Sequence, residues 1–286
     1  MSGAPAEGGR DVFVVLTHLL SPRIERRIGR AREALGATHD VHVVGGFPDG
    51  VEVPDAFRRR EGFHAFGPAE LRMEGWPRKG RGEPFGLMQG AADLPLLALA
   101  RRLPDLRRLW SFEGDVEFTG PLDALTAAFE GSPADLLGTS IRPTPPNWAH
   151  RRASLRPEGW AAPEGEVIGF LPALRASRAL IDAVERFYAA GGDGNHEWVW
   201  PFAAQASGLT LEDMGGDGPF VREGNRNRFY TSSPRRRGLH PGTFRFRPVM
   251  IRPGRRRMTL WHPVKDWLTP EEAGEGGGAP WPGRKD

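Results

Sequence analysis

The sequence predicts an α/β protein with a mostly parallel central sheet flanked by helices and a mixed second half. Residues 11–17 contain a continuous apolar run, as expected for a strand that is covered on both faces. A helical pattern and a second apolar strand follow directly, which gives a strand–helix–strand unit. Strands and helices then continue to alternate through the first half of the chain, a pattern typical of a Rossmann-type parallel sheet.

The first helix is defined at both ends. Ser21 is a good N-cap and Pro22 a good first residue, and Gly36 ends a stretch with apolar residues at helical spacing. Residues 41–44 form the second strand. Residues 47–85 predict loops with one short strand at 63–66, and residues 86–102 predict a helix that Pro95 should start or kink. This helix leads into an apolar strand at 106–112.

The second half combines shorter elements. The patterns predict helices at 121–129, from Ser177 to Gly191 and from about His196, with strands at 135–140, 167–171, 209–213 and 244–249. Residues 142–165 form a loop rich in Pro and Trp that is too long to be a simple connector, which favours a functional role.

Composition limits the class of protein. Of the 286 residues, 39% are apolar and 26% charged, and none is cysteine, so disulfides and thiolate metal sites are excluded. We expect one domain over residues 11–268 with disordered tails at 1–10 and 269–286, no signal peptide and no membrane span, and hence a cytoplasmic protein. The arginine runs 235–237 and 255–257 could bind polyphosphate, although solvated loops explain such runs more often, and we expect no nucleic-acid partner.

Two acids follow the strand at 106–112. Glu113 and Asp115 are spaced i and i+2, which places them on the same face of an extended chain, and Gly114 leaves the backbone between them open. Two hard oxygen ligands at the carboxyl end of a buried strand suit Mn²⁺ or Mg²⁺. The alternative is a solvated strand end that carries two acids.

Two further segments carry titratable side chains. His196 and Glu197 open a helix, so Glu197 either acts as a general base toward an acceptor hydroxyl or only complements the helix dipole. His262 lies between Trp261 and Pro263 and is followed by Lys265. The histidine could join a cation site and the lysine could neutralise a phosphate, whereas a packed structural histidine is the alternative. The chain has no P-loop, dinucleotide fingerprint or nucleophile elbow.

Taken in order, these segments resemble GT-A-fold glycosyltransferases, most closely a poorly characterised bacterial-type branch. The resemblance is carried by Trp110–Gly120 with its Glu-x-Asp-Val, by Leu136–Pro143, by Arg175-Ala-Ser177, by Asn195-His-Glu197 and by Trp261-His-Pro-Val-Lys265. It implies a GT-A fold and a metal-dependent transfer of a sugar from a nucleotide-sugar donor. It also implies that Glu113, Asp115 and His262 bind the cation, that Asp115 takes part in catalysis, and that Glu197 is the base of an inverting reaction.

On this hypothesis the remaining polar and aromatic candidates divide between donor and acceptor. We expect Thr17, His18, Asp93 and Lys265 to contact the donor, and Trp148 and His196, with Trp160 on the same loop as Trp148, to shape the site of an unknown carbohydrate or other acceptor. Each polar residue could equally be a cap or a packed side chain, and the tryptophans could only hold the loop in place. Two other functions stay open, a non-catalytic nucleotide- or sugar-binding protein of the same fold and a sugar-phosphate nucleotidyltransferase.

Overall fold

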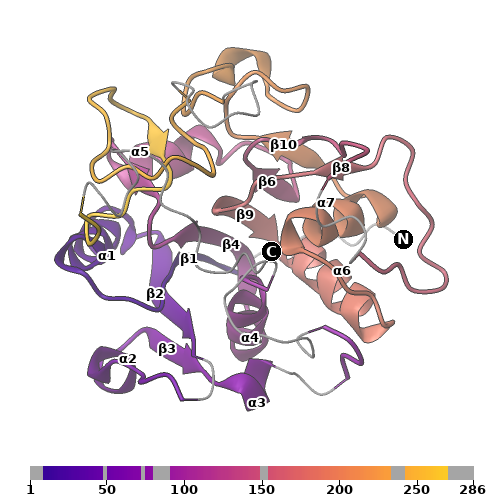
Figure 1. Cartoon of the computed structure of the whole chain (residues 1–286), viewed down its shortest axis with the longest axis horizontal. Helices are drawn as coiled ribbons and strands as arrows, with labels where there is room; N and C mark the ends of the chain where they lie inside the picture. The colour runs from indigo at the N-terminus through magenta and orange to yellow at the C-terminus, as the bar shows by residue number, and fades with distance from the viewer. Residues whose placement is uncertain are drawn as a thin grey trace.

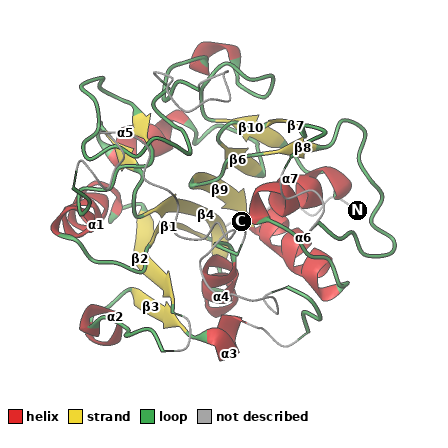
Figure 2. Cartoon of the chain, viewed as in Figure 1, coloured by secondary structure: helices red, strands yellow, loops and turns green. Residues whose placement is uncertain are grey.

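The computed structural model describes residues 9–47, 50–71, 75–79, 91–148, 154–232 and 242–269. Its centre is a seven-stranded sheet in the order β10-β6-β9-β4-β1-β2-β3, in which only β9 runs antiparallel to its neighbours. The strands are β1 (Arg10–Leu16), β2 (His39–Gly46), β3 (Phe63–Phe66), β4 (Leu106–Glu113), β6 (Leu136–Gly138), β9 (Ala173–Ser177) and β10 (Leu211–Asp213). The predicted α/β class, with a mostly parallel sheet flanked by helices, is confirmed (Figure 1, Figure 2).

Helices cover both faces of the sheet (Figure 2). On one face, α1 (Pro22–Leu35) and α5 (Leu122–Ala128) pack on apolar residues of alternate positions such as Phe13 and Val15. On the other, α4 (Leu94–Arg102), α6 (Arg178–Ala189) and α7 (His196–Ala206) pack on Val12 and Val14. The alternation of β1 side chains between two cores explains its continuous apolar run. Smaller helices are α2 (Asp55–Arg59), α3 (Pro68–Leu71) and the 3₁₀ turn Glu223–Asn225.

The predicted helix ends are formed by the expected chemistry. The Ser21 hydroxyl accepts a hydrogen bond from the Ile24 N–H at 3.3 Å, and the Ser177 hydroxyl accepts one from Leu180 N–H at 3.1 Å. Asn195 caps α7 by accepting from the Glu197 N–H at 2.8 Å. Within the described part of the predicted helix 86–102, α4 begins only at Leu94. Proline is tolerated in the first turn of a helix but not in its interior, so a helix that contains Pro95 begins just before it.

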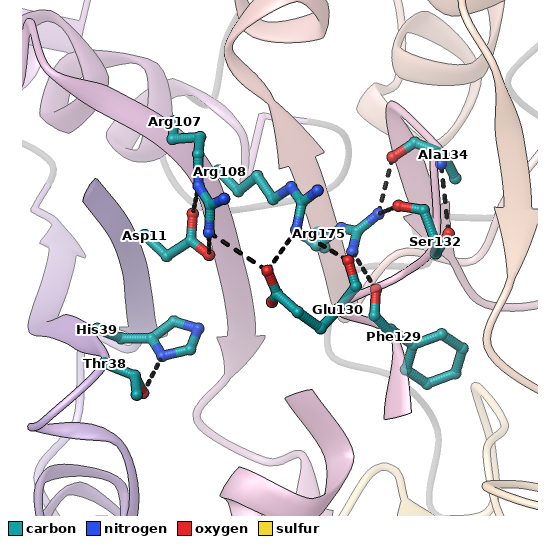
Figure 3. Close-up of polar contacts among 10 residues, drawn as sticks. All are labelled: Asp11, Thr38, His39, Arg107, Arg108, Phe129, Glu130, Ser132, Ala134 and Arg175. Carbon is teal, nitrogen blue, oxygen red and sulfur yellow. Dashed lines mark hydrogen bonds and ion pairs between the residues drawn. The ribbon is translucent and has the colours of Figure 1, made fainter. Parts of the chain in front are cut away.

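Strand β9 was not predicted, because a buried arginine interrupts its apolar pattern. Arg175 is 1% exposed in the middle of the sheet. Its guanidinium donates to the carbonyl oxygens of Phe129 (2.7 Å), Ser132 (3.1 Å) and Ala134 (2.8 Å), as Figure 3 shows. These bonds stabilise the buried charge through Nη1 and Nη2 and connect β9 to the loop between α5 and β6. In the same figure Arg107 of β4 pairs with Asp11 of β1 at 2.6 Å.

Four short strands complete the described structure. β7 (Arg142–Pro143) pairs antiparallel with β8 (Val167–Ile168), which is shorter than the predicted 167–171. β5 (Glu117–Phe118) pairs antiparallel with β11 (Leu260–Trp261). The predicted strand 244–249 is wrong, since this segment forms only one isolated bridge, from Phe244 to His262, and the bridge from Met250 to Val264 lies just beyond it.

Several sequence-based predictions concern the ends and loops of the chain. Most of the predicted tails and the arginine run 235–237 lie outside the described residues. Arg255–Arg257 are exposed, consistent with a solvated loop. Among the helices in the described ranges, none combines the length and the apolar character that crossing a bilayer requires.

Candidate functional site

The two acids of the Glu-x-Asp motif lie at the carboxyl edge of the sheet. The Glu113 N–H donates to Pro172 O and the Gly114 N–H to Leu16 O, both at 2.8 Å, so the turn after β4 is fixed from both sides. A Cβ atom on Gly114 would lie 2.8 Å from the hydroxyl oxygen of Thr17, which explains why glycine separates the acids. The carboxyl ends of strands are where open α/β sheets bind ligands.

His262 reaches these acids from the other end of the chain. The pairing of β11 with β5 brings the C-terminal segment beside the turn, and Val264 N–H donates to Asp115 O at 2.8 Å (Figure 1). Nε2 of His262 lies 3.3 Å from Asp115 Oδ1 and 3.9 Å from Glu113 Oε2, so the expected proximity is confirmed.

The ring of His262 is held in one orientation. Its Nδ1 lies 2.8 Å from the carbonyl oxygen of Arg245, which requires the proton on Nδ1 and turns Nε2 toward the acids. The rings of Phe170 and Phe244 pack against it at centroid distances of 5.1 and 5.2 Å. Each of Glu113, Asp115 and His262 offers one ligand atom, and these atoms lie within 4.8 Å of one another.

Opposing charges set the protonation of the cluster. Burial and the charge of Asp115 raise the pKa of Glu113 to about 7. Burial alone would raise the pKa of Asp115 as well, but His262 and Lys265 hold it below its ordinary value. Burial would lower the pKa of His262, but the carboxylates, Asp115 first, raise it. The negative charge of Asp115 is therefore balanced by His262 and Lys265.

A cleft of about 210 Å³ opens beside the acids. Its lining includes Thr17, His18, Lys265, Trp267 and Ala92 together with the Glu113–Asp115 turn. Nζ of Lys265 lies 3.3 Å from Asp115 Oδ2. Three of the four predicted donor-binding residues therefore share one cleft with the acids.

Glu197 lies at the start of α7, where its carbonyl oxygen accepts a hydrogen bond from the Gly169 N–H at 2.9 Å. Burial, followed by the charge of Glu113, raises the pKa of Glu197 to about 7, and the charges of Arg142 and His262 oppose this rise. The Glu197 carboxylate is therefore within electrostatic range of Glu113, His262 and Arg142. A carboxylate that is half protonated near pH 7 has the proton affinity that general-base catalysis requires.

The remaining predicted residues are placed elsewhere. The carboxylate of Asp93 is buried, where it accepts from Tyr188 Oη (2.5 Å) and Trp200 Nε1 (3.1 Å) and pairs with Lys79, while its neighbour Ala92 lines the cleft. Trp148 and Trp160 pack partly buried against the core beneath α6 and α7, and the Trp160 ring lies 5.2 Å from that of Phe187. His196 is buried at the first position of α7.

A buried arginine that was not predicted from the sequence holds the turn that carries the two acids. Arg27 of α1 is 7% exposed. It pairs with Glu117 at 2.7 Å and donates to the carbonyl oxygens of Gly114 and, at 3.4 Å, Val264. Arg23 and Arg30 face the same carboxylate. The i, i+4, i+7 spacing of these arginines on the predicted helix was the one available signal, because it puts them on a single face.

Replacing Arg27 with methionine is expected to lower the free energy of unfolding by about 3 kcal/mol, because it removes one partner of a buried ion pair. The effect stays at the lower end of the usual range because Arg23 and Arg30 still face Glu117. Urea denaturation measures the change. Arg26→Met, at an exposed position of the same helix, is the control, and equal stability of the two variants would contradict the positioning role.

No protein-family model matches the chain, and no curated protein matches it in sequence. Similar solved structures include a protein from Bacillus anthracis named for glucose-1-phosphate thymidylyltransferase activity, with 10% identity, a TM-score of 0.39, and coverage of 72% of this chain and 86% of that one. A galactosyltransferase with donor and acceptor sugar analogues has 14% identity, a TM-score of 0.35, and coverage of 72% and 75%. Core-mannan synthase A from Aspergillus fumigatus, in a Mn/GDP form, has 11% identity, a TM-score of 0.35, and coverage of 82% and 83%. At these identities and TM-scores, the similarities carry no inference about the reaction or substrate of this chain.

Proposed function

We propose that the protein is a metal-dependent glycosyltransferase that uses a nucleotide-sugar donor. The observation that carries the proposal is the convergence of Glu113, Asp115 and His262 from opposite ends of the chain, beside a cleft and with Glu197 close by. A cluster that only stabilised the fold would not need two acids at a strand end with one lysine and one oriented histidine.

The donor set fits a divalent cation. Two carboxylates and one imidazole suit Mn²⁺, and Mg²⁺ less well because of the nitrogen ligand. Asp115 Oδ1 is buried and makes no well-aligned hydrogen bond within the described part of the chain. The bond from His262 Nδ1 to Arg245 O leaves Nε2 free to act as a ligand. In metal-binding histidines the other ring nitrogen usually donates its hydrogen in this way to a carbonyl or carboxylate oxygen.

The residues around the cation site divide the chemistry among them. When bound, the cation would neutralise charge on the leaving nucleoside diphosphate. Lys265 would bind a phosphate oxygen, while Thr17 and His18 line the same cleft and would contact the nucleotide. Glu197 would accept the proton of the acceptor hydroxyl as that oxygen attacks the sugar, which leads to inversion.

Binding of nucleoside diphosphates to the intact protein tests this function. We expect at least one of UDP, GDP, ADP, CDP and dTDP to raise the melting temperature with Mn²⁺ present and to have little effect without it. Ligand at about 100 times its dissociation constant adds about 2.7 kcal/mol of stability. If no nucleoside diphosphate stabilises the protein with Mn²⁺, the proposal fails. Hydrolysis of the corresponding nucleotide-sugar then separates an enzyme from a binding protein.

A further inference from the structure

We infer that the acceptor carries an anionic group, a phosphate or a carboxylate, and that Arg142 binds it. The inference rests on the proposed function, because it assigns the partner of the group that Glu197 would deprotonate. It is carried by the position of Arg142, by the way its turn is held, and by the pairing of the other cations around the site.

The β7–β8 pair places Arg142 next to the start of α7. Arg142 of β7 lies opposite Ile168 of β8. The next residue, Gly169, donates its N–H to the carbonyl oxygen of Glu197 at 2.9 Å. Arg142 and Glu197 are thus linked through two consecutive residues, Ile168 at the end of β8 and Gly169 directly after it. The positive charge of Arg142 accordingly acts on the Glu197 carboxylate.

The turn that carries Arg142 is fixed from below by buried groups. The Ser140 N–H donates to Tyr230 Oη at 2.6 Å, and the Ile141 N–H donates to Asp213 Oδ2 at 2.8 Å. Tyr230 in turn donates to Asp213 Oδ1 at 2.7 Å. Ser140 adopts a φ of 49°, a conformation that a residue other than glycine rarely keeps without such support. The base of the arginine side chain is therefore preorganised.

The guanidinium itself has room for a ligand. Arg142 is exposed, and its Nη1 donates to Ser140 O at 3.1 Å. Among the described residues no carboxylate lies within ion-pair distance of it, whereas Arg156 pairs with Glu166 and Lys265 with Asp115. The remaining donors of the guanidinium form a planar fork that matches a carboxylate or a phosphate. An acceptor anion held there would keep the acceptor hydroxyl near Glu197.

Binding of small sugars to the intact protein tests the inference. The protein is first saturated with Mn²⁺ and the nucleoside diphosphate that stabilises it most, so that the donor cleft is filled. Glucose, glucose 6-phosphate and glucuronate are then titrated by calorimetry. We expect the wild type to bind at least one anionic sugar about tenfold more tightly than glucose, the size of one charge-assisted hydrogen bond. The two anionic sugars distinguish a phosphate from a carboxylate.

Variants connect this preference to Arg142. Arg142→Gln should abolish the preference for an anionic sugar, and Arg142→Lys should keep part of it. Arg10→Gln, at an exposed arginine that begins the central strand β1, should leave it unchanged. Equal binding of all three sugars to the wild type, including no binding, would overturn the inference, as would a preference that survives in Arg142→Gln. Failure of the first step, binding of Mn²⁺ and nucleotide, would instead count against the proposed function.

Discussion

Replacing Glu197 with glutamine is expected to slow transfer by about 10²–10⁴-fold while donor binding stays nearly unchanged. The amide keeps the shape of the side chain but cannot accept a proton. The loss is measured as the ratio of single-turnover rates of wild type and variant with a nucleotide-sugar. The nucleophile is water or, once one has been identified, an acceptor. Glu158→Gln, at an exposed glutamate of the long loop, is the matched control.

The pH dependence of the same variant identifies the group. Because the pKa of Glu197 is raised to about 7, the wild-type rate should rise as pH increases through 7 and then level off, and this inflection should be absent in Glu197→Gln.

The free energy of unfolding should change with pH in the opposite sense. A folded-state pKa above the ordinary 4.5 means that the folded protein binds the proton more tightly, so stability falls as pH rises from 4.5 to 7. Glu197→Gln should therefore melt no lower than wild type at pH 8. A lower melting temperature with turnover retained would show a glutamate that only complements the helix dipole.

Replacing Asp115 with asparagine is expected to abolish Mn²⁺-dependent nucleotide binding, with a loss of at least about 100-fold in affinity. Substituting a residue that is only hydrogen-bonded to a metal ligand already lowers metal affinity by about 10–100-fold, and Asp115 would itself be a ligand. The fold should persist, because the backbone bonds of the turn do not use the side chain. Calorimetry with nucleoside diphosphate and Mn²⁺ measures the affinity.

A control at the other end of β4 tests whether the loss of affinity depends on the position of the acid or only on the loss of one negative charge. Asp105→Asn removes an exposed acid just before the strand and should bind Mn²⁺ and nucleotide as the wild type does. Circular dichroism of both variants without metal checks the fold. Unchanged affinity in Asp115→Asn would remove the metal role from the acidic pair, whatever the result for Glu197.

The part of the site that lies within one strand could be predicted from the sequence. An apolar run ending in two acids at i and i+2 fixes their common face, and the Ser21 and Ser177 caps fix two helix starts, because each signal is local. Asp93 shows the limit of such reasoning. A polar residue before a helix looks the same whether its side chain faces a cleft or accepts bonds from Tyr188 and Trp200 in the core.

Long-range features could not be derived from local patterns. The chemistry of His262 made it a candidate cation ligand, but its place beside these acids was implied only by the resemblance, since the pairing of β5 with β11 involves just two residues from each strand. Strand β9 was missed because Arg175 satisfies its charge with three carbonyl oxygens that are distant in sequence. Arg142 entered the sequence-based resemblance only as part of the segment Leu136–Pro143. Its role could not be predicted, because the buried Asp213 and Tyr230 that hold its turn come from a later part of the chain.

The short β5–β11 pair has a consequence for synthesis of the protein. His262 and Lys265 are synthesised well after the acids, since His262 follows Asp115 by 147 residues (262 minus 115). A nascent chain can therefore form β1, β2 and β4 with the acids exposed and with neither His262 nor Lys265 beside them. Only a chain that extends past β11 can close the pair, so shorter products would present two acids without the other groups that we propose for retaining a cation and a nucleotide together.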